Sequence, residues 1–254
     1  MITFTSLGNL GRLGNQMFQY AMLLGTADLL GYSVGVDVEK SFLNNFKLKA
    51  ASPLPENFVP QYTYQESDFR YSAAHRYLQD GGNIKGYFQS PLYFAHCLDL
   101  VLSEFQFRDE IVEACLEKSK FIKQANICAI HVRRQDYISK QHLYPACTMQ
   151  YYQSAWEQIR ASGHFEYMIF SDDIEWCQDS FEWLPGCHFS HVKSGLADMH
   201  LMSQCQAHIM SNSTFAWWGA TLAQSNQVIA PLKWFSESFI PDWQDIYWPH
   251  WQKL

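Results

Sequence analysis

The chain has 254 residues, enough for one large α/β domain or for two domains of about 120 residues each. Hydrophobic residues make up 48% of it and charged residues 17%, below the roughly 25% of an average globular protein, which excludes an intrinsically disordered chain. The formal net charge of −7 argues against a nucleic-acid partner, because tracking a phosphate backbone needs a basic face.

The N-terminal stretch predicts a β-α-β unit followed by an irregular region. Asn15 suits the N-cap of the helix in this unit, and Gly31 suits the left-handed position after its end. Prolines and scattered aromatic residues predict irregular, partly helical structure over residues 44–100. The expected elements are a strand over 2–7, a glycine loop over 8–14, a helix over 15–30 and a strand over 33–37.

The second half of the chain predicts another β-α series. A charged helix over 109–124 leads into it and makes a plausible crossing between two domains, 1–122 and 123–254. Short strands separated by helices indicate a mostly parallel sheet with right-handed crossovers. The expected strands are 127–132, 166–170, 187–190, 207–211 and 227–230, and the expected helices are 149–161, 196–205 and 214–224.

The glycine loop resembles a dinucleotide-binding turn without matching it. Gly8, Gly11 and Gly14 are spaced G-x-x-G-x-x-G, one residue away from the G-x-G-x-x-G that packs a pyrophosphate, and Asp37 ends the next strand. An NAD-dependent oxidoreductase therefore stays an alternative, as does a plain βα turn. Arg12 and Asn15 add a charge and an amide at the start of the helix, where anions bind.

A basic pair follows the strand at 127–132, where an open α/β sheet binds its ligand. Side chains alternate along a strand, so we expect Arg133 and His131 on one side and Arg134 on the other. An arginine fork matches two phosphate oxygens at once, which favours a diphosphate ligand. The alternative is a surface arginine pair that bridges to Asp136.

Two further strand ends carry polar residues. Asp172 and Asp173 follow the strand at 166–170, but they are adjacent and not at i and i+2, so they do not indicate a metal-binding pair; either one suits a helix cap. The run from Ser211 to Thr214 ends one strand and opens a helix, where hydroxyls, amides and free N–H groups could cradle a phosphate. A simple Ser/Thr cap would explain two of these four residues.

The cysteines and histidines indicate no disulfide frame and no zinc site. Seven cysteines are odd in number and lack C-x-x-C spacing, which fits a reducing cytosol. We find neither a leader nor a membrane span, so we expect a soluble, cytoplasmic protein. The residues that crowd one region without a standard zinc spacing are Cys187, His188, His191, His200, Cys205 and His208.

Five blocks, taken in order, resemble the α-1,2-fucosyltransferases of glycosyltransferase family 11, in a bacterial form. The resemblance implies an α/β, GT-B-like fold of two facing Rossmann-like domains, with GDP-β-L-fucose held by the C-terminal one and the acceptor near the N-terminal one. It also implies inverting, metal-independent transfer without a cofactor other than the donor, onto the 2-hydroxyl of a galactose-terminated acceptor. The blocks are residues 11–21, 86–90, 131–137, 170–173 and 211–219.

The same resemblance implies roles for single residues. Arg133 would stabilise the departing GDP, Asn15 would share the catalytic cleft, and Asp198 would hold the guanine. The acceptor proton would pass to an unidentified base, for which Glu66, Asp68 and Asp172 are candidates, or to a phosphate oxygen of the donor. The remaining residues expected to bind GDP-fucose are Arg12, His131, Asp136, Asn212, Ser213, Thr214 and Phe215.

Two departures from the family pattern put the acceptor preference in doubt. Gln135 stands where many members have glycine, and Arg12 stands where many bacterial members have glycine and animal members have arginine. Animal members carry a membrane anchor that this sequence lacks. We therefore expect a bacterial enzyme that decorates polysaccharide or lipopolysaccharide precursors, with peripheral membrane association as an option. A nucleotide-sugar-binding protein without turnover is a third alternative.

Overall fold

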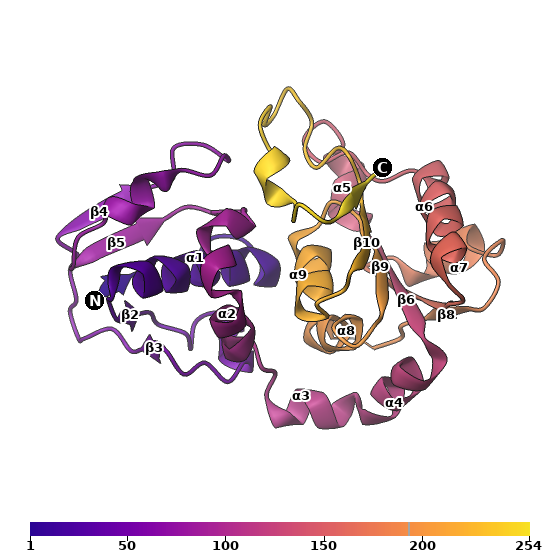
Figure 1. The fold of residues 1–254 in the computed structure, drawn as a ribbon, viewed down its shortest axis with the longest axis horizontal. Helices are drawn as coiled ribbons and strands as arrows, with labels where there is room; N and C mark the ends of the chain where they lie inside the picture. Colours follow the sequence, from indigo (N-terminus) through magenta and orange to yellow (C-terminus); the bar gives the residue numbers. More distant parts are fainter. Residues whose placement is uncertain (193) are drawn as a thin grey trace. The chain divides into compact units, whose positions relative to one another are not determined.

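The computed structural model describes residues 1–192 and 194–254, which form two compact units (Figure 1). Unit 1 comprises Met1–Arg108 and Asp242–Trp248, and unit 2 comprises Asp109–Pro241 and Pro249–Leu254. The first boundary between the units lies between residues 108 and 109, whereas the expected boundary lay between residues 122 and 123. The reason is that α3 (Asp109–Ala114) and α4 (Leu116–Ala125) both contact α8 (Gly195–Met202) of unit 2.

Unit 1 is built on a five-stranded parallel sheet with the strand order β3-β2-β1-β5-β4. Three of these strands lie in the stretch that was expected to be irregular. The expectation missed these strands because they are short and carry few apolar residues, whereas its helical part is confirmed by 3-10 helices such as Ala73–Tyr77 and Pro91–Tyr93. The strands are β1 (Ile2–Thr3), β2 (Val34–Gly35), β3 (Ala51–Ser52), β4 (Tyr62–Gln65) and β5 (Gly82–Lys85).

Helix α1 (Leu13–Leu30) follows β1 and is buried along most of its length. It begins two residues earlier than expected, with Arg12 as its N-cap and a first hydrogen bond from Gln16 N to Arg12 O at 3.0 Å. Asn15 therefore lies inside the first turn and is not the N-cap. The predicted end is confirmed, since Gly31 adopts φ 69° and ψ 32° in the left-handed region. The shorter helix α2 (Leu98–Glu104) also belongs to this unit.

Unit 2 is built on a six-stranded parallel sheet with the strand order β11-β10-β9-β6-β7-β8. Continuous apolar runs make its inner strands recognisable, because a parallel sheet is covered on both faces. The strands are β6 (Ile127–Val132), β7 (Glu166–Ser171), β8 (Cys187–Phe189), β9 (Ala207–Ile209), β10 (Gln227–Ala230) and β11 (Gln252–Lys253). The helices besides α3, α4 and α8 are α5 (Gln135–Ser139), α6 (Met149–Ser162), α7 (Ile174–Ser180) and α9 (Thr214–Leu222).

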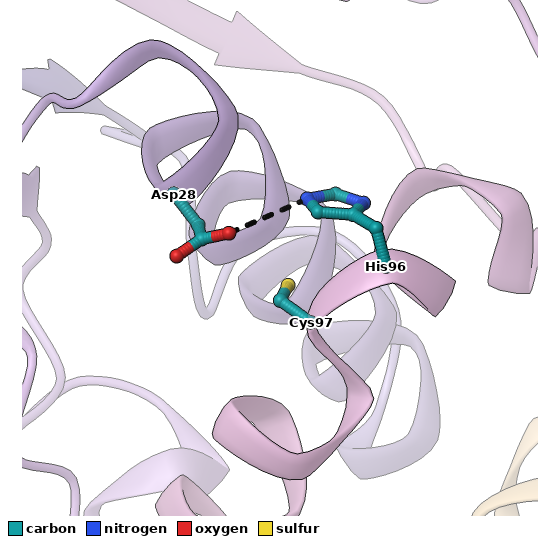
Figure 2. A group of neighbouring side chains, drawn as sticks. All are labelled: Asp28, His96 and Cys97. Atoms are coloured by element: carbon teal, nitrogen blue, oxygen red, sulfur yellow. Dashed lines mark ion pairs between the residues drawn. The ribbon is translucent and has the colours of Figure 1, made fainter.

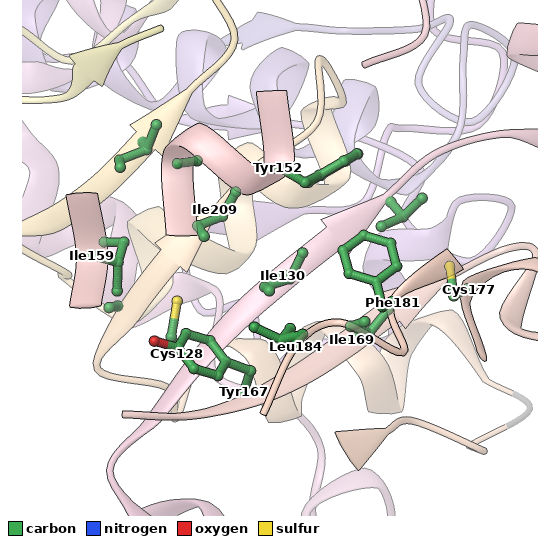
Figure 3. Close-up of a cluster of buried hydrophobic side chains, with 14 residues drawn as sticks. Cys128, Ile130, Tyr152, Ile159, Tyr167, Ile169, Cys177, Phe181, Leu184 and Ile209 are labelled. Atoms are coloured by element: carbon green, nitrogen blue, oxygen red, sulfur yellow. The ribbon is translucent and has the colours of Figure 1, made fainter. Parts of the chain in front are cut away.

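The core of unit 2 forms where the central strands meet α6. Ile130 of β6, Ile169 of β7 and Ile209 of β9 are fully buried, and Tyr152 of α6 packs in the same cluster (Figure 3). All seven cysteines lie among the described residues and are free, as expected for a reducing compartment. This core fixes the strand ends from which the polar residues emerge.

The predicted α/β class with parallel sheets is confirmed in both units. In the part of the chain that the structure describes, none of the helices is long and apolar enough to cross a membrane.

Candidate functional site

The carboxyl ends of three neighbouring strands in unit 2 bring predicted polar residues to one edge of the sheet. β6 ends just before Arg133, β7 ends before Asp172, and β9 leads into the turn at 211–213. All three strands are parallel, so their carboxyl ends share the edge at which α/β sheets bind ligands.

The Arg133 guanidinium is held between two carboxylates. Its Nη2 lies 2.7 Å from Asp136 Oδ1 and its Nη1 lies 3.1 Å from Asp172 Oδ2, while the Tyr137 ring centroid is 5.7 Å from its Cζ. Helix α5 starts directly after the strand and turns Asp136 and Tyr137 back toward Arg133. Because 20% of the Arg133 side chain stays exposed, it is a fixed cation that a ligand can still reach.

Arg134 has different partners from Arg133. Its Nε lies 3.1 Å from Asp173 Oδ2, and its guanidinium carbon lies 3.6 Å from the ring centroid of Trp176 on α7. Its backbone N–H donates to Asp172 Oδ1 at 2.9 Å, so Asp172 contacts both arginines. Asp173 also caps α7 by accepting from Trp176 N at 3.3 Å, as predicted for one of the two acids.

His131 is buried and neutral beside Arg133. Burial, and then the charge of Arg133, lowers the pKa of His131 to about 3. Its Nδ1 lies 2.8 Å from Ser211 Oγ, and its ring centroid lies 5.5 Å from that of Phe215. A Cβ at Gly195 would lie 3.7 Å from the Phe215 ring. The contact between the two rings therefore connects β6 with the start of α9, and the Phe215 ring also lies near the start of α8.

Asp198 lies in the first turn of α8 and is partly buried. Burial raises the pKa of its carboxyl group to about 6, although the Ser190 hydroxyl and Lys118 both lower it. Ser190 Oγ donates to Asp198 Oδ1 at 2.5 Å. Near neutral pH this carboxylate can accept hydrogen bonds from a ligand.

The turn before α9 supports the site with its backbone more than with the Asn212 side chain. Asn212 Nδ2 donates to Pro145 O at 3.0 Å and to Trp234 O at 2.9 Å, so both of its amide hydrogens hold loops of unit 2 together. Ser213 is the N-cap of α9, but within the described residues its hydroxyl does not cap the helix. The capping alternative thus fails for Ser213, and the first N–H groups of α9, from Thr214 onward, point out of this helix end, where an anion can bind.

Asn15 and Arg12 belong to unit 1, at the start of α1. Gln89 Nε2 donates to Asn15 Oδ1 at 3.1 Å, and Arg12 is exposed. A Cβ at Gly11, whose φ is +73°, would lie 2.3 Å from Asn15 Nδ2. The second glycine of the loop is therefore required for the position of the Asn15 amide.

The three candidate bases have different environments. Glu66 follows β4 and accepts from Tyr87 N at 2.6 Å and from Phe88 N at 2.8 Å; burial raises its pKa to about 7 against these two hydrogen bonds. Asp68 is exposed and accepts from Arg70 N at 2.8 Å in a local turn. Asp172 is already paired with Arg133.

One group of potential metal ligands lies together among the residues that the structure describes. It consists of Asp28, His96 and Cys97 of unit 1 (Figure 2), and not of the cysteines and histidines between 187 and 208. His96 Nε2 lies 3.7 Å from Asp28 Oδ2 but 3.1 Å from Gly25 O, so its ring nitrogen already has a partner. Burial raises the pKa of Cys97 to about 11, which keeps the thiol protonated. The group thus consists of a hydrogen-bonded ring nitrogen, a protonated thiol and an exposed carboxylate, and we assign no metal ion to it.

Several residues of the site were missed at the sequence level. Tyr137 donates from its hydroxyl to Asn212 O at 2.8 Å and flanks Arg133, while Trp176 and Gln89 position Arg134 and Asn15. The signal available for Tyr137 was its place in the same short segment as Arg133, but α5 has only five residues and shows no helical pattern from which the contact could be predicted.

Comparison with known proteins places this geometry in an enzyme family. Residues 2–254 match the family described as Glycosyl transferase family 11. The O-antigen biosynthesis glycosyltransferase WbnK of Escherichia coli is 29% identical over 196 residues, which cover 72% of this chain but only 64% of that protein. The alpha-1,2-colitosyltransferase of Escherichia coli is 27% identical over 263 residues, covering 89% of this chain and 90% of that protein.

A primate relative and a solved structure agree with this match. Galactoside alpha-(1,2)-fucosyltransferase 2 of Pongo pygmaeus is 24% identical over 279 residues, covering 95% of this chain and 78% of that protein. The crystal structure of NodZ alpha-1,6-fucosyltransferase soaked with GDP-fucose aligns with a TM-score of 0.59 at 13% identity, covering 89% of this chain and 93% of NodZ. This likeness shows the fold, and the predicted GT-B-like class is confirmed.

Proposed function

Because the chain belongs to glycosyltransferase family 11, we propose that it is an inverting fucosyltransferase acting on GDP-β-L-fucose. The acceptor is the 2-hydroxyl of a galactose-terminated oligosaccharide, giving an α-1,2 linkage. The names of the Pongo relative and of the colitosyltransferase support this linkage. The single observation that carries the chemistry is the Arg133 guanidinium, fixed between Asp136 and Asp172 yet partly exposed at the ligand edge of the sheet.

Leaving-group stabilisation is the step that Arg133 performs. Cleavage of the glycosyl–diphosphate bond builds negative charge on a β-phosphate oxygen, and a fixed cation aimed there lowers the barrier without reorganising. His131 stays neutral, so it supports the pocket and supplies no charge. Ser213, Thr214 and the N–H groups at the start of α9 add donors for the diphosphate, and Asp198 accepts from the guanine. No metal or further cofactor enters this proposal.

The acceptor hydroxyl must lose its proton during the transfer. Glu66 is the base that the environment favours, because a pKa near 7 matches a general base working at neutral pH. Arg12 and Asn15 complete the donor cleft in this proposal, and Asn15 acts on the reacting sugar.

Colitosyl transfer is a second candidate function. The colitosyltransferase matches over 90% of its own length, which is more than the share of WbnK or of the Pongo enzyme. For both candidates we propose a cytoplasmic enzyme that works in the assembly of surface polysaccharide precursors such as O-antigen, which the name of WbnK supports. The NAD-dependent oxidoreductase and the binding protein without turnover have no comparable support.

A mass-spectrometric acceptor screen tests the proposal. The purified protein is incubated with GDP-fucose, or with the matching colitosyl donor, and a panel of galactose-terminated oligosaccharides. We expect one fucose to be added, with an α-1,2 linkage that an α-1,2-fucosidase removes. Arg133→Ala is the inactive control. Transfer from neither donor, or a fucosylated product that resists this fucosidase, would reject the proposed reaction.

A further inference from the structure

Unit 1 contains a hollow of about 340 Å³ at the carboxyl edge of its own sheet. One wall is the loop after β1 at Gly8, and the other is the segment from Glu39 to Asn45 after β2. Helix α1 starts from the same edge, and Gln16 in its first turn also lines the hollow. We call it the Phe42 pocket. Its volume is at the lower end of the roughly 300–1,000 Å³ of small-molecule sites, which suits one sugar unit better than a long oligosaccharide.

The pocket is preformed by hydrogen bonds between its walls. Gln16 Nε2 donates to Gly11 O at 3.1 Å, and Gln16 Oε1 accepts from Phe42 N at 2.8 Å, so one buried side chain ties both walls together. Ser41 Oγ accepts from Leu43 N at 3.1 Å and donates to Val38 O at 2.8 Å. Binding of a ligand therefore costs little conformational entropy of the protein, because the walls are already fixed.

The lining combines an exposed aromatic ring with neutral and acidic polar groups. The Phe42 residue is 48% exposed although its backbone is anchored, and the amides of Asn44 and Asn45 lie beside it in the lining. Asn45 Nδ2 donates to the backbone oxygen of Phe42 at 2.9 Å and to Asn44 Oδ1 at 2.7 Å, which fixes both amides on this wall. A sugar has the matching chemistry, since a ring face of C–H groups packs on an aromatic ring and its hydroxyls pair with amides and carboxylates.

A charged ligand fits this pocket less well. Glu39 contributes a carboxylate, and the Lys40 ammonium lies 3.1 Å from Asp37 Oδ2. Among the described residues, the lining therefore has no excess positive charge that would bind a phosphate. A neutral polyhydroxylated ligand matches both the aromatic ring and the polar groups.

We infer that the Phe42 pocket binds the terminal galactose unit of the acceptor, with Phe42 as the stacking surface and Glu39 and Asn44 pairing with its hydroxyls. The inference rests on the proposed transfer to a galactoside, and it identifies the part of unit 1 that selects the acceptor. Donor binding is independent of it.

The test measures saturation-transfer NMR of lactose, a galactose-terminated disaccharide, on the full chain with and without GDP. Phe42→Ala should weaken lactose binding, and raise the acceptor KM, by about tenfold, while GDP affinity stays within twofold. Tyr77→Ala is the matched control, because Tyr77 is 84% exposed in the same unit and lies outside the pocket lining. Thermal unfolding confirms that each variant is folded.

Two results separate this inference from the proposed function. If Phe42→Ala binds lactose as well as the native chain does, or if the native chain gives no lactose signal, the pocket assignment is wrong whatever the activity. If lactose binding depends on Phe42 but no fucose is transferred from GDP-fucose, the pocket stands and the proposed reaction fails. Asn44→Ala provides a second variant that removes a hydrogen-bonding group without opening the aromatic wall.

Discussion

Arg133 and Arg134 are neighbours in sequence with separate surroundings. Arg133 is shared by Asp136 and Asp172, whereas Arg134 pairs with Asp173 and stacks on Trp176. A stacked, paired arginine ties α7 to the end of β6, so Arg134 contributes to stability. In the proposed mechanism Arg133 is the one that acts on the ligand.

Substitution at these two positions should separate chemistry from folding. Arg133→Lys should lower kcat more than it changes the donor KM, because lysine keeps the charge but loses the two-pronged geometry. Arg133→Ala should lower kcat by at least roughly 10³, by analogy with charge-stabilising arginines in phosphoryl transfer. Arg134→Ala should lose stability and keep most of its turnover in steady-state kinetics. If Arg134→Ala abolishes turnover while Arg133→Ala keeps it, the roles are reversed.

Asp198 should make GDP binding depend on pH. Burial raises its pKa to about 6 in the folded protein, so its contribution to folding stability is present at low pH and is lost as the pH rises through 6. GDP binding depends on pH in the opposite direction and strengthens as the pH rises, because only the ionised carboxylate accepts two guanine N–H groups. Calorimetry should show the Kd for GDP rising as the pH falls below about 6. Asp198→Asn should bind GDP weakly at every pH, and an unchanged pH profile in this variant would exclude Asp198 as the guanine acceptor.

Helix α1 lies between two glycines, Gly11 before its start and Gly31 after its end, and their surroundings differ. Gly11 and Gly31 both adopt left-handed φ values, +73° and +69°. A Cβ at Gly11 would collide with Asn15, whereas a Cβ at Gly31 would enter open space in the described chain. Both positions carry the same backbone cost, but only Gly11 adjoins a predicted site residue.

Alanine at these two glycines is therefore a matched pair. Each variant should lose about 1–2 kcal/mol of stability from the left-handed backbone, measured by urea unfolding. Gly11→Ala should also lose most of its turnover, because the Asn15 amide must move, while Gly31→Ala should keep native kinetics. Equal turnover in the two variants would show that the position of Asn15 does not matter for the reaction.

Among the helices and strands, the sequence predicted the buried ones well and the polar ones poorly. The strand at 127–132 and the helix start at 149 agree with the structure, because apolar runs and a Thr148 cap mark them. Strand β4 consists of tyrosine, threonine and glutamine with alternating exposure, and α5 is a single short turn, so neither has an apolar pattern to recognise. The resemblance supplied Arg133 and Asp198, but their partners Asp172 and Ser190 come from other segments, which a linear pattern does not reveal.

The whole molecule depends on a returning segment, Asp242–Trp248, that completes unit 1. Asp245 Oδ2 accepts from Tyr71 N at 2.8 Å, and Asp245 O accepts from the Ser90 hydroxyl at 2.8 Å. The Arg70–Asp242 pair of the same segment is exposed, with Nη2 and Oδ1 2.9 Å apart. The partly buried contacts of Asp245 should therefore matter more than this ion pair.

Alanine scanning of the two aspartates checks this ranking. Asp245→Ala should cost about 1–3 kcal/mol of unfolding free energy, because it leaves the Tyr71 N–H without its acceptor. Asp242→Ala should cost at most about 1 kcal/mol, as exposed pairs do. Urea unfolding followed by tryptophan fluorescence measures both, and a larger loss for Asp242→Ala would contradict the assignment.

The proposed reaction should not require a metal ion. We expect transfer to persist in excess EDTA, because Arg133 and the start of α9 supply the charge stabilisation in the proposed mechanism. A loss of activity that Mn²⁺ or Mg²⁺ restores would reject that mechanism. Chelator-treated enzyme, dialysed against metal-free buffer and assayed with GDP-fucose, provides the measurement.

The returning segment also sets an order of events during synthesis. The ribosome produces residues 1–108 first, but unit 1 has to wait for residues 242–248, which emerge after nearly all of unit 2. Until then the ring of Phe94 lacks its edge contact with Trp248, whose ring centroid lies 6.3 Å away in the finished protein. A nascent chain arrested before residue 242 therefore holds an unfinished N-terminal unit with part of its aromatic core open to chaperones, although this unit is the first to be translated.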